Sequence, residues 1–241
     1  YKGYCNDADR YSVTHGRIGM WDLKTEDPRV QKILSAYIQS LKACGVDGIR
    51  WDAIKHVGLP SENDSFMANV VDQDMYNYGE ILNTPGPNPD KLFKEYTQYM
   101  SVTDNTYGND VTQAFAAGGT SKLKGNLVFR GIKGNKLVYW GESHDTYSNS
   151  GRDAWSKYVD QQFIDRSYAI MAGNNDATTL YYSRPLGKEA KDIIFGAKGS
   201  THFTAPQVAE VNHMHNKCAG EPNCCVSNSD LMAQVRKSGA V

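Results

Sequence analysis

The chain has 241 residues, with 26 lysines and arginines, 27 aspartates and glutamates, and a formal net charge of -1. Charges of both signs are mixed along it, which argues against a basic nucleic-acid-binding surface and against an acidic disordered tail. No apolar run approaches the roughly 18 residues that a membrane-spanning helix needs. We therefore expect neither nucleic acid nor membrane as a partner, and the length allows one large domain or one domain with part of a second.

Aromatic residues are the distinctive part of the composition, with 15 tyrosines and 4 tryptophans. Aromatic faces stack on the apolar faces of sugars and bases, although the same residues also fill ordinary cores. The five cysteines cannot all pair within the chain. A bond from Cys218 to Cys224 or Cys225 would close a short loop, and Cys44 is expected in the core. Without a CxxC pair, the sequence argues against a zinc site.

The first clear element is a helix between Asp27 and Gly45. Asp27 suits the N-cap, Pro28 suits the first helical position, and Gly45 suits the left-handed residue that ends a helix. Apolar residues recur between them at three- and four-residue steps, which predicts one apolar stripe made of Val30, Ile33, Leu34, Tyr37, Ile38, Leu41 and Cys44. A short strand is expected directly afterwards at Gly48–Ile54.

The alternation of helix and strand continues downstream. We expect strands at Asp74–Ile81, Leu127–Arg130, Leu137–Gly141, Thr178–Tyr182 and within Asp230–Val241, and helices at Asp90–Met100, Asp153–Ala172 and Ala205–His215. A polar cluster rather than a tight hairpin turn follows most of these strands, which is typical of a parallel α/β fold. Four or five such strands are too few to close an eight-stranded barrel, so the pattern predicts the C-terminal part of a longer (β/α)8 barrel.

Three acids follow strands of this pattern, namely Asp52, Glu80 and Asp145. Catalytic residues of a (β/α)8 barrel lie after the C-terminal ends of its strands. Cleavage of a glycosidic bond with retention needs two carboxyl groups about 5–5.5 Å apart, and a third acid can bind the distorted sugar ring. Acids at strand ends also serve magnesium sites and phosphoryl transfer, so their positions alone leave these alternatives open.

Local motifs around the acids narrow the choice. Gly48–His56 (GIRWDAIKH) resembles the signature around the nucleophile of the α-amylase family. Tyr78–Ile81 (YGEI) resembles the strand with the family's general acid, and Trp140–Thr146 (WGESHDT) resembles the segment with its third acid. Tyr181–Pro185 resembles the eighth strand, and Gly19–Leu23 resembles the lead into the fourth helix–strand unit. These motifs occur in the family's order, and the resemblance covers nearly the whole chain.

The resemblance implies a retaining glycoside hydrolase that cleaves internal α-1,4 bonds of starch and related glucans. Asp52 would be the nucleophile, Glu80 the general acid and then the base, and Asp145 would hold sugar hydroxyls. One alternative is another family member with maltogenic, pullulan-cleaving or transglycosylating activity. Others are a catalytically silent glucan-binding protein, which would not need a paired nucleophile and acid, and an unrelated α/β domain with chance motifs.

Four further residues receive substrate-binding roles from the resemblance. Arg50 would hydrogen-bond the acids and keep Asp52 ionised, since the two residues lie on one strand face; a plain structural ion pair is the alternative. His144 would bind sugar hydroxyls beside the third acid. Lys55 and His56 would line the leaving-group side.

Other polar residues near the motifs receive no catalytic role. Glu142 is left out because the family's third acid is the aspartate that follows the histidine. His213 and His215 point apart on the helix expected around them, so they are expected to be surface or packing residues.

A structural calcium ion is also implied by the resemblance. Calcium takes carboxylate and backbone carbonyl oxygens, and the matching positions are the Asp22 side chain and the His56 carbonyl, with a carbonyl near Thr14 less certain. The family's asparagine ligand belongs to an earlier strand that this chain does not contain, so the site is expected to be incomplete.

The resemblance also predicts how the chain is organised. Residues 1–22 would end an inserted loop domain and lead into the barrel, residues 23–218 would form the C-terminal part of the barrel, and residues 219–241 would begin a C-terminal β-sandwich domain. The expected partners are an α-glucan and the missing N-terminal part of the same protein. The expected location is extracellular, secreted or at the cell surface.

Overall fold

The computed structural model describes residues 1–82, 89–119, 123, 131–149, 151–174, 176–228 and 230–241. The chain divides into two compact units: unit 1 is Tyr1–Thr103 with Arg130–Ile132, and unit 2 is Asp104–Phe129 with Lys133–Val241. Within the described ranges, no helix has the length and apolarity needed to cross a membrane. The strand expected at Leu127–Arg130 lies outside the described residues.

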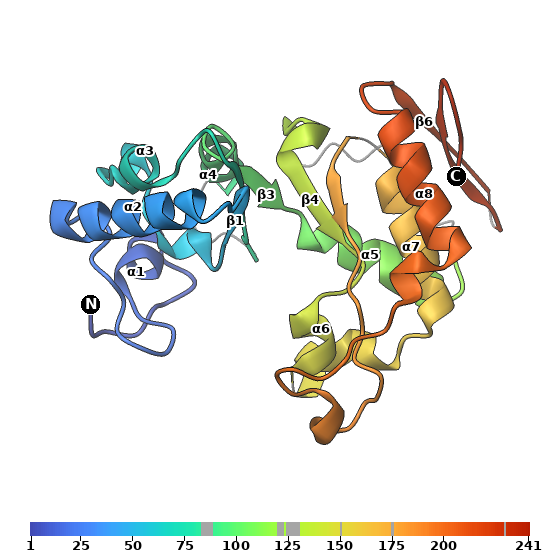
Figure 1. The fold of residues 1–241 in the computed structure, drawn as a ribbon, viewed down its shortest axis with the longest axis horizontal. Helices are drawn as coiled ribbons and strands as arrows, with labels where there is room; N and C mark the ends of the chain where they lie inside the picture. The colour runs from blue at the N-terminus through green and yellow to red at the C-terminus, as the bar shows by residue number, and fades with distance from the viewer. Residues whose placement is uncertain (83–88, 120–122, 124–130, 150, 175, 229) are drawn as a thin grey trace. The chain divides into compact units, whose positions relative to one another are not determined.

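Unit 1 alternates helices with parallel strands (Figure 1). Its helices are α1 (Arg10–His15), α2 (Pro28–Ala43), α3 (Phe66–Val70) and α4 (Pro89–Tyr96), with short 3₁₀ helices η1 (Ile54–His56) and η2 (Pro60–Glu62). Its strands are β1 (Gly48–Trp51), β2 (Tyr76–Gly79) and β3 (Ser101–Thr103). β2 pairs in parallel with β1, from Gly48↔Tyr76 to Trp51↔Gly79, and with β3. Because the strands are parallel, their C-terminal ends meet at one edge of the sheet.

Helix α2 has the predicted ends but not the predicted buried face. The Asp27 side chain accepts a hydrogen bond from the Arg29 backbone N–H at 2.9 Å, and Gly45 has a φ of +89°. The buried side chains of α2 centre on Gln31 and Ile38, whereas Ile33 and Tyr37 are 69% and 57% exposed.

The expectation that Cys44 is a core residue is wrong, because its side chain is exposed. At 3.6 residues per turn, Ile33, Tyr37 and Cys44 fall on the side of the helix away from Gln31. The apolar stripe predicted from the spacing therefore coincides only partly with the buried face of α2.

The end of β2 packs closely against the turn that follows β1. Gly79 is buried, and a Cβ at this position would lie 2.5 Å from Ile54 Cγ2 and 2.7 Å from Met100 Sδ. A glycine is therefore needed for this approach. It brings the residue after β2 next to the residues after β1.

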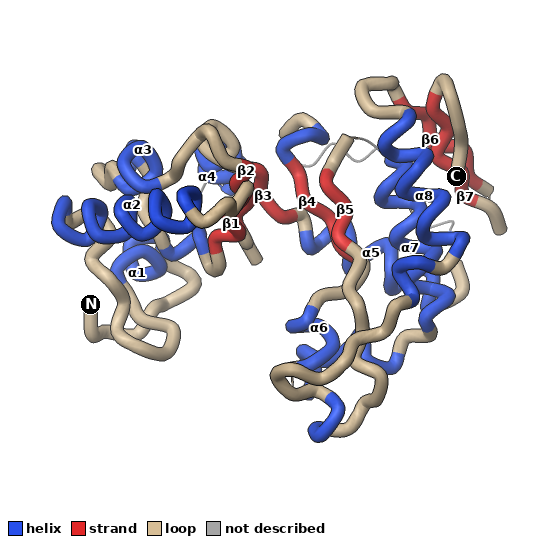
Figure 2. Tube along the Cα trace, viewed as in Figure 1, coloured by secondary structure: helices blue, strands red, loops and turns tan. Residues whose placement is uncertain are grey.

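Unit 2 contains a second group of parallel strands and a hairpin (Figure 2). Its strands are β4 (Leu137–Trp140), β5 (Thr178–Leu180), β6 (Asn223–Ser227) and β7 (Met232–Arg236). Its helices are α5 (Asn105–Ala116), α6 (His144–Ser148), α7 (Gln161–Asn174) and α8 (Pro206–Lys217), with 3₁₀ helices η4 (Gly134–Lys136), η5 (Gly151–Tyr158), η6 (Ala190–Asp192) and η7 (His202–Thr204). β4 and β5 are parallel, β6 and β7 are antiparallel, and the hairpin contacts α7.

Close packing joins the layers of unit 2. A Cβ at Gly108 of α5 would lie 1.9 Å from the Trp140 carbonyl oxygen of β4, so this helix lies directly on the strand. Helices α7 and α8 share an apolar core of Tyr168, Ala172, Val208 and Val211. The end of β4 is thereby fixed between α5 and the rest of the unit.

The structure also tests what the sequence predicted for the cysteines and for His213 and His215. All five cysteines of the chain are free, so the possible bond from Cys218 to Cys224 or Cys225 is not formed in this structure. Cys218 is buried near Gly239, whereas Cys224 is exposed on β6. His213 is exposed beside Glu210 at 3.6 Å, and His215 Nδ1 lies 2.7 Å from the Ala172 carbonyl oxygen. The expected surface and packing roles of the two histidines are confirmed.

Candidate active site

Asp52 and Glu80 follow two neighbouring strands at the same edge of the unit 1 sheet. Asp52 comes directly after β1 and Glu80 directly after β2, whose last residues are paired. The Glu80 backbone N–H donates to the Trp51 carbonyl oxygen at 2.9 Å. The register of the two strands therefore places the two predicted acids side by side.

Arg50 joins the two carboxylates. Its Nη1 lies 2.6 Å from Asp52 Oδ1 and its Nη2 lies 2.9 Å from Glu80 Oε1. Burial alone would lower the pKa of Arg50, but the hydrogen bond with Asp52 and the charge of Glu80 outweigh it and raise the pKa. The expected contact of Arg50 with both acids is confirmed, and its guanidinium is a fixed positive charge between them.

The two acids differ in solvent access and in their contacts. The Asp52 side chain is 76% exposed, whereas that of Glu80 is 11% exposed. Glu80 Oε2 also accepts a hydrogen bond from the Ala53 backbone N–H at 3.1 Å. Ala53 has a φ of +46°, in the left-handed region that residues other than glycine rarely adopt. This conformation directs the N–H of the residue after Asp52 to the carboxylate of Glu80.

Lys55 and His56 occupy the 3₁₀ helix η1 that follows. Lys55 Nζ donates to the Leu82 carbonyl oxygen at 3.0 Å, and its side chain is 16% exposed. His56 Nδ1 lies 2.9 Å from the Val13 carbonyl oxygen. Burial lowers the pKa of His56, while this hydrogen bond opposes the change. Both side chains have contacts within unit 1, and their roles toward a sugar remain predictions.

The predicted metal ligand Asp22 contains a buried oxygen without a partner. Asp22 Oδ2 is buried and has no hydrogen bond, and burial raises the pKa of this carboxyl. An unpartnered buried carboxylate oxygen is costly and suits a hard cation. Among the described residues no group of three or more histidine, cysteine, aspartate or glutamate side chains is arranged for a metal. Calcium here would therefore also need carbonyl oxygens, of which His56 was predicted to supply one.

Asp145 and His144 begin helix α6 of unit 2. The cap of this helix is Ser143, whose hydroxyl accepts from the Thr146 N–H at 3.4 Å while its own N–H donates to Thr146 Oγ1 at 2.9 Å. His144 Nε2 lies 3.5 Å from Asp145 Oδ2, and the two side chains are 60% and 37% exposed. Both predicted sugar-binding groups are thus adjacent and open to solvent.

Glu142, which precedes Asp145 by three residues, forms a buried ion pair with Arg184. Arg184 Nε and Nη2 lie 2.7 and 2.9 Å from the two oxygens of Glu142, whose side chain is fully buried. Burial raises the pKa of Glu142, and the charge of Arg184 opposes this. Leaving Glu142 out of the catalytic set agrees with this geometry.

Sequence reasoning gave no role to Arg184, nor to Arg10 of α1, which pairs with Glu62. Both arginines lie in polar segments, and no local pattern marks their distant partners.

The chain is similar in sequence to bacterial α-amylases. It is 28% identical over 261 residues to an α-amylase of Butyrivibrio fibrisolvens, covering 92% of this chain and 26% of that protein. It is 27% identical over 256 residues to an α-amylase of Clostridium acetobutylicum, covering 100% of this chain and 31% of that protein. The chain therefore spans about a quarter to a third of the length of these relatives. No family model matches the chain.

Solved structures show the same fold. α-Amylase I from Eisenia fetida, crystallised as a variant with maltohexaose, matches 97% of this chain and 55% of that chain with a TM-score of 0.70 and 17% identity. The cyclomaltodextrin glucanotransferase CldA matches 98% of this chain and 51% of that chain with a TM-score of 0.68 and 17% identity. This chain is thus similar in sequence to α-amylases, and its fold matches part of the fold of these solved structures, as expected for part of a (β/α)8 barrel.

Proposed function

We propose that this chain carries the nucleophile and the general acid of an α-amylase that hydrolyses internal α-1,4 bonds of starch-like glucans with retention. The observation that carries the proposal is the pairing of Asp52 with Glu80 by Arg50 at the ends of adjacent parallel strands. The naming of its sequence relatives as α-amylases supports the substrate class.

The reaction would proceed in two displacements. In the first, a carboxylate oxygen of Asp52 attacks the anomeric carbon while Glu80 gives its proton to the leaving glycosidic oxygen. The product is a glycosyl ester on Asp52 and a free chain end. In the second, Glu80 takes a proton from water, the water oxygen attacks the anomeric carbon, and the ester bond to Asp52 breaks. The sugar hydroxyls would be held by Asp145 and His144.

Arg50 would serve both displacements electrostatically. Its guanidinium lies 2.6 Å from Asp52 Oδ1 and would stabilise the negative charge that returns to Asp52 when the ester breaks. Lys55 and His56 would contact the departing chain. In the first displacement, Arg50, Lys55 and His56 would assist Asp52 and Glu80, whose positions are fixed by the paired ends of β1 and β2.

A structural calcium ion and an extracellular location belong to the same proposal. The unpartnered oxygen of Asp22 supports the calcium site, with the His56 carbonyl as a second ligand. Such an ion would neutralise a buried carboxylate and tie the segment before α2 to the turn after β1. The secreted location rests on the resemblance to secreted family members.

The test is hydrolysis of maltoheptaose followed by NMR of the first product. The 241-residue protein and its longest natural form would both be assayed, with circular dichroism as a folding control. We expect the α-anomer to form first, since two inversions at the anomeric carbon give retention. An initial β-anomer, or no cleavage by a well-folded protein, would contradict the proposal.

A transglycosylating family member is the second candidate, because a cyclomaltodextrin glucanotransferase has the same fold over 98% of the chain. Both enzymes would share the first displacement and differ in whether water or a sugar hydroxyl receives the glycosyl group. Chromatography of the products separates them. Cyclic or lengthened glucans would favour the transferase, and only shorter maltooligosaccharides would favour the amylase.

A further inference from the structure

The side chain of Arg10 reaches from helix α1 into the segment that follows the nucleophile. Its Nε and Nη2 lie 2.7 and 2.8 Å from the two carboxylate oxygens of Glu62, and its side chain is only 11% exposed. Burial opposes the charge of Arg10, but the pairing with Glu62 outweighs it and raises the pKa. Two parallel bonds to one carboxylate fix the plane of the guanidinium.

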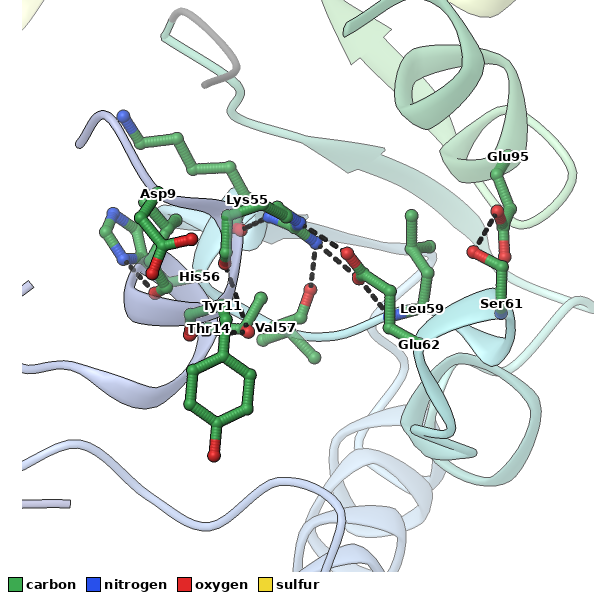
Figure 3. A network of polar contacts seen from close by, with 12 residues as sticks. Asp9, Tyr11, Thr14, Lys55, His56, Val57, Leu59, Ser61, Glu62 and Glu95 are labelled. Atoms are coloured by element: carbon green, nitrogen blue, oxygen red, sulfur yellow. Dashed lines mark hydrogen bonds and ion pairs between the residues drawn. The ribbon is translucent and has the colours of Figure 1, made fainter. Parts of the chain in front are cut away.

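The remaining donors of Arg10 bind backbone carbonyl oxygens around η1. Nη1 donates to the Lys55 carbonyl oxygen and Nη2 to the Val57 carbonyl oxygen at 3.3 Å. Figure 3 shows Glu62, Lys55 and Val57 in this network. Arg10 therefore joins a carboxylate of η2 to the peptide units at the end of η1.

Tyr96 of α4 completes the attachment. Arg10 Nη2 lies 3.0 Å from the Tyr96 hydroxyl oxygen, and that hydroxyl lies 2.7 and 3.1 Å from the carbonyl oxygens of Val57 and Ile54. The ring is fully buried, and burial raises the pKa of Tyr96 to about 12. The hydroxyl remains a neutral donor whose one proton is shared between the carbonyl oxygens of Val57 and Ile54, so this pair of side chains holds the carbonyls of Lys55 and Val57 and also contacts that of Ile54.

The held segment begins next to the two acids. Ile54 follows Ala53, whose left-handed backbone directs its N–H to Glu80 Oε2 at 3.1 Å, and Ala53 follows Asp52. A rotation of the Ala53 peptide unit would move the nucleophile and release this contact of Glu80 together. The Lys55 carbonyl oxygen that Arg10 binds belongs to the third residue after Asp52. Arg10 therefore fixes the backbone of the segment that directly follows this acid.

We propose that Arg10 is a positioning residue for the Asp52 and Glu80 pair, acting through the backbone of residues 53–57. This inference rests on the proposed function, since it explains how the relative positions of Asp52 and Glu80 are maintained. Arginine is required because one lysine ammonium cannot form the bidentate pair with Glu62 and bind the carbonyls of Lys55 and Val57 at the same time. Supporting contacts of this kind decide whether a catalytic pair keeps a productive geometry.

The test compares Arg10→Ala and Arg10→Lys with the matched control Arg29→Ala, whose side chain is 89% exposed. Kinetics on maltoheptaose should show kcat lower by about 100-fold in both Arg10 variants, because a shift of about 1 Å at the reacting groups can cost that much. KM should change little, and Arg29→Ala should behave as wild type. Low millimolar guanidinium should restore part of the kcat of Arg10→Ala but not of Arg10→Lys.

Two further measurements separate positioning from loss of folding. Tyr96→Phe leaves the charged side chain of Arg10 in place and removes only the tyrosine hydroxyl. This variant should fold, and its kcat should fall by a smaller factor than that of the Arg10 variants. Amide hydrogen exchange of residues 53–57 should be faster in the Arg10 variants than in wild type. Unchanged kcat in folded Arg10 variants of an active protein would overturn the positioning role. An inactive wild type with the same change in exchange would count against the proposed function instead.

Discussion

Glu80 is the residue on which the proposed chemistry depends most directly. Glu80→Gln keeps the size of the side chain and can keep a contact with Arg50 or with the Ala53 N–H, but an amide cannot supply the proton that the leaving oxygen needs. General acid–base catalysis contributes about 10²–10⁴-fold, so we expect kcat to fall by about that factor. Calorimetry with maltoheptaose should show binding close to that of wild type.

Glu95→Gln is the matched control for this change. Glu95 lies in the same unit and accepts hydrogen bonds from the Ser61 backbone N–H and hydroxyl at 2.9 and 2.7 Å. It has no part in the proposed reaction. Full activity of Glu80→Gln on starch would show that another group is the acid.

The acids themselves were predictable from sequence, and their supports were not. Asp52, Glu80 and Arg50 stand in short motifs whose residues are neighbours in the chain or follow strands, so local reading found the residues that the structure brings together. Arg10 and Arg184 bind partners 52 and 42 positions away. Such partners are set by how the strands and turns pack, which no local pattern records.

At the scale of elements, the buried pair of Glu142 and Arg184 joins the end of β4 to the segment after β5. Arg184 Nη2 also lies 3.1 Å from the Ser156 carbonyl oxygen of η5, and the guanidinium lies 5.2 Å from the centre of the Tyr147 ring in α6. The pair therefore holds together the elements around Asp145.

Breaking this pair should destabilise unit 2. Removal of one partner leaves an uncompensated buried charge, which typically costs about 3–5 kcal/mol. We expect Arg184→Met to lower the free energy of unfolding by that amount in urea titrations. The double variant Glu142→Leu/Arg184→Met should recover a large part of the loss, because no buried charge remains. Equal losses in the single and double variants would show that the pair is not coupled.

Asp165 of α7 gives a pH-dependent contribution to stability. Burial alone would raise the pKa of Asp165, but hydrogen bonds from Tyr181 at 2.6 Å, from His202 at 2.8 Å and from Gln207 at 3.2 Å outweigh it and lower the pKa. The unfolded chain therefore binds this proton at higher pH than the folded protein. The stability that Asp165 contributes is present above its unfolded pKa of about 3.9. It is lost as pH falls through the lower pKa of Asp165 in the folded protein.

Asp165→Asn tests this sign. Its stability should lie below that of wild type near pH 5, and the difference should shrink steadily as pH falls from about 4 toward 2. Asp153→Asn, at an exposed position of η5, is the control. A difference that stays constant over this range would mean that Asp165 contributes by packing rather than by its charge.

Elements with strong local signals were predicted, and short or weakly patterned ones were missed. Helix α2 has caps at both ends, and β1, β2, β4 and β5 lie within the expected ranges. Strand β3 has only three residues, and α5 contains polar residues and glycine, so neither has a clear period. The face that α2 buries depends on α3 and the segment before it, which Gln31 contacts, and this explains the error at Cys44.

At the scale of the whole molecule, calcium should stabilise the protein through Asp22. The Oδ2 atom of this residue is buried without a hydrogen bond, so a bound cation would give this oxygen a partner. A ligand that binds only the folded state at 100 times its Kd adds about 2.7 kcal/mol. We expect EDTA to lower the Tm of the wild type and calcium to restore it.

Asp22→Asn should abolish this response, while Asp74→Asn, which alters a side chain that is 86% exposed, should retain it. Burial raises the pKa of Asp22, so protons should compete with calcium and weaken its binding in acid. A wild-type Tm that does not respond to EDTA would contradict the calcium site.

The fold class was the part of the whole molecule that sequence order could predict. A (β/α)8 barrel repeats one helix–strand unit, so a few units in the right order identify it, and the solved neighbours confirm this reading. The predicted boundaries at residues 22 and 218 remain predictions, since the division of the chain into two compact units falls in sequence between Thr103 and Asp104, inside the predicted barrel segment.

The difference in solvent access between the two acids has a practical consequence for labelling. Asp52 is 76% exposed and Glu80 is 11% exposed, so a small electrophile from solution meets Asp52 first. A sugar analogue with a good leaving group and a slowly hydrolysed ester would leave its mass on the peptide that contains Asp52. Water-soluble carbodiimide with a tagged amine would likewise modify Asp52 before Glu80. The folded protein should therefore accept a covalent tag at Asp52 without denaturant, and labelling by the sugar analogue would report the fraction of molecules that are competent for the proposed first displacement.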